Sequence, residues 1–100
     1  MSTQVEIDQE RIADFCRKWQ ITELALFGSV LRDDFRPDSD VDVLVTFAPE
    51  AKWSLMDLAE IEIELTEIFG RGVDLVEKDA LKNPFRRYAI LTSKEVLYAA

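Results

Sequence analysis

The sequence contains no histidine and only one cysteine, Cys16. The lack of histidine excludes Ser-His-Asp and Cys-His catalytic triads, histidine general bases and histidine-ligated zinc sites. A single cysteine can form neither an intrachain disulfide nor a CxxC metal site. The first ten residues are polar and lack the apolar core of a signal peptide, so we expect a cytoplasmic protein. No apolar run approaches the roughly eighteen residues of a membrane span, so we expect no membrane association.

Glycine and proline are also scarce, at three residues each among 100, while 48% of the chain is apolar. This composition excludes a disordered chain, and the length predicts a single domain over residues 1–100. Basic residues are fewer than acidic residues, 12 against 20, which gives a net charge of -8. Such a surface repels phosphates and argues against direct nucleic-acid binding. It suits the binding of divalent cations or docking on a basic protein.

Helical and strand-like segments alternate along the chain. Helices are predicted to start at Asp8, at Ser29 (ending near Asp34), at Ser54 (ending at Gly70 and Gly72) and at Pro84. Strands are predicted over Glu23–Phe27, Asp40–Phe47, Val73–Val76 and Val96–Tyr98. This order predicts an α+β fold, a sheet with helices packed on it.

The first predicted helix has one apolar face. Asp8 is its expected N-cap, with Ile7 before it and Ile12 positioned to form a hydrophobic staple. The apolar residues of this helix recur at helical spacing and predict its core face: Ile12, Phe15, Cys16 and Trp19. No basic residue adjoins Cys16 on that face, so we interpret it as a core thiol rather than a reactive one.

The long helix after Ser54 has more apolar residues than one stripe needs. Ser54 and Asp57 are spaced like a capping box. The predicted core stripe is Leu55, Leu58, Ile61, Leu65, Ile68 and Phe69. Met56 and Ile63 lie beside it, and a wide buried arc is favoured over a partner-facing patch. On the helix after Pro84, a solvated face is slightly favoured for Arg86 and Arg87 over contact with a nucleotide or partner.

Two carboxylates interrupt the apolar pattern of the second strand. Asp40 and Asp42 are two residues apart, so their side chains point to the same face. Like charges held together repel, and burying them is costly unless a cation or several donors compensate. All-oxygen ligands suit Mg²⁺ or Mn²⁺. Asp74 lies in the next strand, where sheet pairing can bring it beside this pair. Taken alone, an Asp-x-Asp pattern is more often a pair of solvated strand-end acids.

The residues upstream make a functional site more specific. Gly28 and Ser29 follow a strand and open a predicted helix, whose N-terminus favours anions. Glycine allows a phosphate to approach the backbone, and Arg32 adds a cationic donor one turn later. Together with the three acids, this arrangement predicts a polyphosphate cradle beside a carboxylate metal site.

The segments Gly28–Arg32 and Pro37–Val45 resemble the signature of the DNA polymerase beta-like nucleotidyltransferase superfamily. More narrowly, the chain resembles the minimal nucleotidyltransferases. The likeness extends to Val73–Val76 and to the ending Asn83–Tyr88. One position departs from the family pattern, because Asp33 stands where members usually carry glycine. The resemblance implies a polymerase beta palm-like α+β fold, a mixed sheet flanked by helices.

The resemblance also implies a reaction and residue roles. Transfer of AMP from ATP to a hydroxyl, with release of pyrophosphate, would use two Mg²⁺ ions. The ions would be held by Asp40, Asp42 and Asp74, and Asp74 would help to deprotonate the attacking hydroxyl. The implied nucleotide contacts are Gly28, Ser29, Arg32 and Ser39.

Minimal members are typically paired with a HEPN-domain ribonuclease toxin, and the resemblance implies that this chain adenylylates a tyrosine of such a partner as its antitoxin. Two alternatives stay open. One is an antitoxin that acts by binding alone, with a vestigial nucleotide site. The other is nucleotidyl transfer to a small molecule, disfavoured because no acceptor-binding domain follows in the sequence. The intact set of three aspartates and Gly28-Ser29 favours the enzyme.

Overall fold

The computed structural model describes residues 8–28 and 40–100. The helices are α1 (Gln9–Lys18), α2 (Leu55–Phe69) and α3 (Pro84–Ser93), with a 3-10 turn, η2 (Lys78–Ala80). The strands are β1 (Ile21–Phe27), β2 (Val41–Phe47), β3 (Val73–Glu77) and β4 (Glu95–Ala99). Apart from the helix predicted after Ser29, which lies outside the described residues, every predicted element is present. The predicted α+β fold with a mixed sheet is confirmed.

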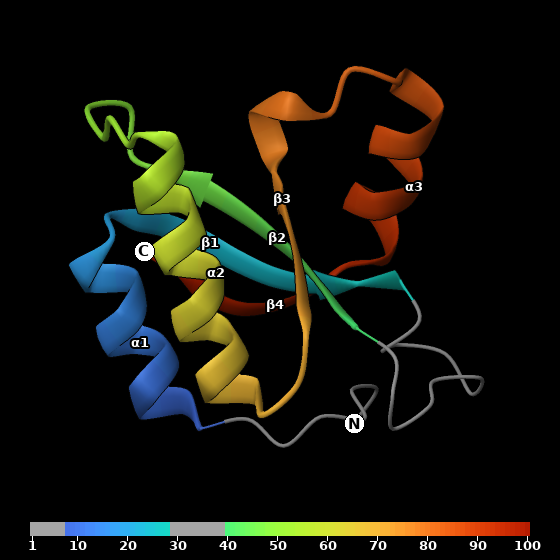
Figure 1. The fold of residues 1–100 in the computed structure, drawn as a ribbon. Helices are drawn as coiled ribbons and strands as arrows, with labels where there is room; N and C mark the ends of the chain where they lie inside the picture. The colour runs from blue at the N-terminus through green and yellow to red at the C-terminus, as the bar shows by residue number, and fades with distance from the viewer. Residues whose placement is uncertain (1–7, 29–39) are drawn as a thin grey trace.

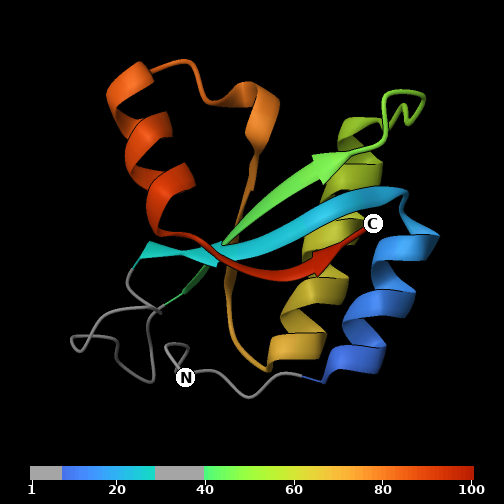
Figure 2. The same cartoon turned by 180° about the vertical axis from the view of Figure 1, so that it is seen from behind.

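The four strands form one sheet in the order β3-β2-β1-β4. β1 pairs antiparallel with both β2 and β4, and β2 pairs parallel with β3. Helices α1 and α2 cover one face of the sheet, and α3 lies on the other side (Figures 1 and 2). The helix α2 is therefore the crossover that parallel pairing of β2 and β3 requires.

Two apolar cores follow from the alternation of side chains along the strands. The larger core lies under α1 and α2 and includes Leu24, Leu26, Val41, Val43, Val45, Ile61 and Leu65. The smaller core lies on the α3 side and consists of Ala25, Phe27, Leu44, Leu81 and Ile90. Residues 42 and 74 alternate with core residues of the first set, so Asp42 and Asp74 belong to the α3 side of the sheet.

Side-chain caps define the helix starts as the sequence predicts. The Asp8 carboxylate accepts a hydrogen bond from Arg11 N (3.2 Å). Ser54 and Asp57 form the reciprocal capping box. Gly70 ends α2 in the left-handed conformation (φ 72°), which glycine adopts without a Cβ penalty. The partner proposed for a staple, Ile7, lies outside the described residues.

The apolar surface of α2 differs from the prediction. Ile61, Leu65 and Phe69 are buried, and Leu58 and Ile68 are half-buried. Leu55, however, is 85% exposed, and the wide buried arc is wrong, because Met56 and Ile63 are 83% and 60% exposed. At about 3.6 residues per turn, these three side chains lie off the Ile61–Leu65–Phe69 ridge that meets the sheet.

Arg87 also differs from the prediction, because it is not only a solvated side chain. Its Nη1 donates to the backbone oxygen of Lys78 (3.1 Å), and the residue is half-buried. This contact ties α3 to η2. Arg86 is exposed, as predicted.

The prediction of a core thiol is confirmed. Cys16 is fully buried, and burial raises its pKa to about 12, opposed weakly by the charge of Arg17. We expect a thiol-specific disulfide reagent at about pH 8 to leave the native protein unlabelled and to label it in denaturant. The folded pKa lies above the unfolded value of 9.0, so this thiol's contribution to stability is complete below about pH 9 and is lost towards pH 12. Rapid labelling of the native protein would contradict the assignment.

Candidate active site

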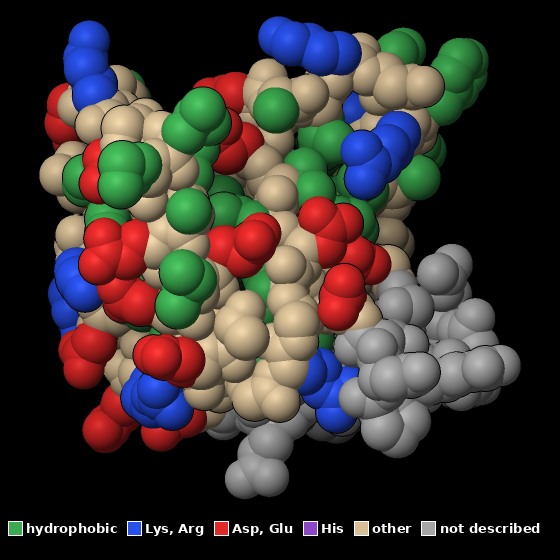
Figure 3. Space-filling view, viewed as in Figure 1, with side chains coloured by type: hydrophobic (Ala, Val, Ile, Leu, Met, Phe, Trp, Pro, Cys, Tyr) green, Lys and Arg blue, Asp and Glu red, His purple; other side chains and the backbone are tan. Residues whose placement is uncertain are grey.

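The three predicted aspartates lie at one end of the sheet. Asp40 directly precedes β2, and Asp42 is the second residue of that strand. Asp74 is the second residue of β3. This end also holds the C-terminal end of β1, which is followed by Gly28. Figure 3 shows acidic side chains gathered to the right of β3, over the ends of β1 and β2.

Strand pairing places two of the carboxylates side by side. Asp42 is the register partner of Asp74 in the parallel β2–β3 pair. Neighbouring strands lie roughly 4.8 Å apart, so both side chains leave the same face of the sheet at adjacent positions. The expectation that the third strand brings its aspartate beside the Asp40–Asp42 pair is confirmed for Asp42.

The carboxylates are more exposed than the sequence suggests. Asp40 and Asp74 are exposed and Asp42 is half-buried, and no charged residue is buried in the described part of the chain. The argument that burial forces a compensating cation is therefore wrong. The aspartates are at least partly exposed because they lie where the strands leave the core, on the face of the sheet that α3 covers only farther along the strands. The argument for a cation that remains is the high density of negative charge where acids stand at adjacent backbone positions.

Two glycines make room for these carboxylates. A Cβ atom added to Gly28 would lie 2.2 Å from Asp42 Oδ2, and one added to Gly72 would lie 2.3 Å from Asp40 Oδ1. Gly28 also has a φ of 76°, a left-handed value that L side chains rarely adopt. Asp42 and Asp40 therefore occupy space that is open only because residues 28 and 72 are glycines without a Cβ atom.

The role of Gly72 was not recognised from the sequence, which indicated only a helix end. Its backbone oxygen accepts a hydrogen bond from Val41 N (2.9 Å), which fixes the strand directly after Asp40. The β2–β3 register indicates this role of Gly72, because Gly72 directly precedes β3 just as Asp40 directly precedes β2. Without that register, the spacing between residues 40 and 72 carries no information.

We expect Gly72→Ala to displace the Asp40 carboxylate and reduce nucleotidyl transfer by about tenfold, a loss of about 1.4 kcal/mol in transition-state stabilisation. The conflicting atom is the end of a flexible side chain, so the melting temperature should change little. Steady-state kinetics and thermal unfolding of the same protein measure both effects. Unchanged turnover by Gly72→Ala would show that transfer does not depend on the position of the Asp40 carboxylate beside Gly72.

The donor chemistry at this end fits a hard divalent cation, because all three groups are carboxylates on adjacent strand ends. The Asp42 and Asp40 carboxylates occupy space that a side chain at Gly28 or at Gly72 would fill. Over residues 8–28 and 40–100, no three acidic side chains are gathered into a ready-made metal cluster. The backbone therefore places the three aspartates at one end of the sheet. The remaining predicted nucleotide contacts, Ser29, Arg32 and Ser39, lie outside the described residues.

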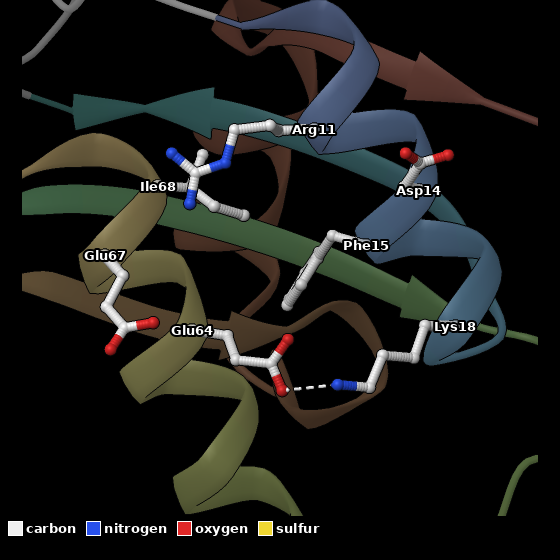
Figure 4. Close-up of a pocket in the computed structure, with 7 residues that line it drawn as sticks. All are labelled: Arg11, Asp14, Phe15, Lys18, Glu64, Glu67 and Ile68. Carbon is white, nitrogen blue, oxygen red and sulfur yellow. Dashed lines mark hydrogen bonds and ion pairs between the residues drawn. The ribbon is translucent and has the colours of Figure 1, made fainter.

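A separate cavity of about 260 Å³ lies between α1 and α2. Charged side chains rim it above Phe15 and Ile68, and Lys18 bonds to Glu64 (2.9 Å) across it (Figure 4). Phe15 packs in the core on the α1–α2 side of the sheet, opposite the face that carries Asp42 and Asp74. The cavity is therefore not the site of the aspartates.

A parallel β2–β3 pair with aspartates at adjacent positions, beside a glycine turn at the end of β1, is the arrangement that the sequence predicts for a nucleotidyl-transfer site. The Nucleotidyltransferase domain family matches residues 10–97, and the chain belongs to this family. It is a nucleotidyltransferase. The finding confirms the resemblance and the enzyme class that the sequence indicates.

Individual relatives agree with this placement. Protein adenylyltransferase MntA of Thermococcus cleftensis is 37% identical over 81 residues, which cover 81% of this chain and 77% of the relative. A solved structure of a minimal nucleotidyltransferase is 31% identical, with a TM-score of 0.71 and coverage of 87% and 86%. An MNT antitoxin complex with a tri-AMPylated Shewanella oneidensis HEPN toxin matches at 20% identity and a TM-score of 0.65. That match covers 92% of this chain and 70% of the other, and shows the fold alone.

In the part of the chain that the structure describes, no helix is long and apolar enough to cross a membrane.

Proposed function

We propose that this chain transfers AMP from ATP to a tyrosine hydroxyl of a HEPN-domain ribonuclease toxin, and so acts as its antitoxin. The observation that carries the proposal is the pairing of Asp42 with Asp74 on one face of the sheet, beside Gly28. The relative named protein adenylyltransferase and the AMPylated HEPN toxin bound to an MNT antitoxin support the acceptor class.

The three aspartates would hold Mg²⁺, which when bound neutralises charge on the phosphates and on the leaving pyrophosphate. Asp40 directly precedes β2 and Asp42 lies within it, and their carboxylates lie against Gly72 and Gly28. Asp74 is exposed, so its carboxylate can reach a hydroxyl that another protein presents and accept its proton. Gly28 and Ser29 would bind the β- and γ-phosphates through backbone donors, with Arg32 and Ser39 as further contacts.

The exposure of the acids supports a macromolecular acceptor. Asp40 and Asp74 stand on the surface rather than at the bottom of a cavity. The cavity between α1 and α2 is on the opposite face. An acceptor must then be held by contacts outside the reacting atoms, and docking would supply most of the positioning that accelerates the transfer.

Labelled ATP tests the reaction. Purified chain, MgCl₂ and a HEPN-domain toxin are incubated with ATP labelled at the α- or at the γ-phosphate. Nucleotidyl transfer predicts that the toxin acquires the α-label only and that EDTA prevents labelling. Label from the γ-phosphate would indicate phosphoryl transfer instead. A toxin that is silenced without any label would favour neutralisation by binding.

A further inference from the structure

Helix α2 carries a second apolar stripe that faces away from the sheet. Leu55 and Met56 are 85% and 83% exposed, and Ile63 is 60% exposed. Ala59 lies between them and is also exposed. Figure 3 shows apolar side chains on the surface over α2, with acidic side chains among them. Isolated exposed apolar residues are ordinary, but several of them repeated at helical spacing along one helix indicate an interaction surface.

The shape of the stripe suits a helix. Leu55, Ala59 and Ile63 are spaced at i, i+4 and i+8, the ridge that packs into the groove of a neighbouring helix. The small Ala59 at its centre permits close approach. Beside this ridge, a groove of about 400 Å³ runs between α2, β3 and the start of α3. Its larger apolar lining residues are Leu58, Leu75, Val76 and Leu81, and its charged ones are Glu62, Glu77 and Arg86. Ala59 borders both features.

The charge around the stripe identifies the chemistry of the occupant. Leu55–Phe69 contains five acidic residues and no basic one, namely Asp57, Glu60, Glu62, Glu64 and Glu67. Glu62 flanks one side of the stripe, and Glu60 and Glu67 flank the other, by their helical positions. A partner with lysines or arginines beside an apolar ridge is complementary to this surface. A second copy of the chain would place two such acidic helices against each other, which electrostatic repulsion opposes.

We propose that the α2 stripe, Leu55, Met56, Ala59 and Ile63, is the docking face for a basic-flanked helix of the acceptor protein. The inference rests on the proposed function only for the identity of that acceptor. The groove beside the stripe includes Leu75, the residue after Asp74, and β3 is an edge strand. Leu75 packs on the α1–α2 side of the sheet and Asp74 belongs to the α3 side. A partner seated on α2 and this groove therefore lies along the β3 edge, and its hydroxyl must reach Asp74 across that edge.

Paired substitutions test the docking face by titration calorimetry with a purified HEPN-domain toxin. Ile63→Glu is expected to weaken the dissociation constant at least about thirtyfold, as loss of a buried anchor does. Val96→Glu is the matched control, because Val96 is 47% exposed on β4, at the sheet edge opposite β3, and the affinity of this variant should stay within about twofold of the wild type. Both positions are exposed, so unchanged melting temperatures would verify folding. Raising the salt concentration should weaken the wild-type complex.

Each result decides the proposal. Wild-type affinity for Ile63→Glu, or an equal loss for Val96→Glu, would overturn it. A chain that dimerises alone in sedimentation, and that Ile63→Glu makes monomeric, would make a second copy the occupant and also overturn it. If Ile63→Glu weakens binding but the wild-type chain transfers no AMP to the bound toxin, the docking face stands and the proposed function is wrong. If the wild-type chain transfers AMP and Ile63→Glu does not alter binding, the proposed function stands and the docking face is wrong.

Discussion

The Asp42→Asn protein is expected to lose nucleotidyl transfer by at least about a thousandfold, equivalent to roughly 4 kcal/mol of transition-state stabilisation. Asp42 is the central acid of the proposed site, because it lies two residues after Asp40 and is the register partner of Asp74. Asparagine keeps the shape of the side chain but removes the negative charge that a cation requires. Initial rates of AMP transfer at saturating ATP and MgCl₂ measure the loss.

The melting temperature of Asp42→Asn distinguishes loss of transfer from loss of folding. Like charges at directly opposed strand positions destabilise a sheet, so removing one should leave the melting temperature unchanged or slightly raised. Trp19 and Trp53 pack edge to face with ring centroids 5.2 Å apart, beside the start of β1 and the end of β2, and their fluorescence reports unfolding away from the site. Asp79→Asn, an exposed acid in η2, is the control and should retain full activity. Wild-type turnover by Asp42→Asn would remove Asp42 from the site.

Gly28→Val is expected to reduce transfer by at least about a hundredfold and to lower the free energy of unfolding by about 2 kcal/mol. Two separate costs arise at this position. A β-branched residue at φ 76° is strained, and its Cβ would lie 2.2 Å from the Asp42 carboxylate. The added side chain also blocks the approach of a phosphate to the backbone.

Gly70→Val distinguishes the two costs. Gly70 has nearly the same φ, 72°, but a Cβ atom there would meet nothing within 4 Å. We therefore expect a similar loss of stability in chemical denaturation with normal transfer by the folded protein. If both variants lose activity equally, or if Gly28→Val binds ATP like the wild type, the phosphate cradle lies elsewhere.

The sequence predicts the elements of this fold well because local signals mark them. Asp8, the Ser54–Asp57 capping box and the left-handed Gly70 act through bonds or dihedral angles within a few residues. The start of β1 is less clear, because a bulge between Ile21 and Glu23 interrupts the simple alternation that identifies a strand. The predicted strand accordingly begins at Glu23, two residues late.

The site and the surface of α2 depend on tertiary structure to different degrees. Asp40 and Asp42 are found from sequence because they are two residues apart, whereas the contact between Gly72 and Asp40 exists only through the β2–β3 register. On α2, apolar residues occupy two arcs, and hydrophobicity alone does not indicate which arc meets the sheet. Packing selects the arc with Ile61, Leu65 and Phe69 and leaves Met56 and Ile63 outside.

Intact-mass spectrometry of a HEPN-domain toxin, after incubation with this chain, ATP and MgCl₂, tests the central claim most directly. The account predicts that the wild-type chain adds mass to the toxin in steps of one adenylate, on a tyrosine, and that Asp42→Asn adds none. Loss of the toxin's ribonuclease activity should follow the added mass. A toxin silenced equally well by the wild-type and Asp42→Asn chains, with no adenylate attached to it, would contradict the account.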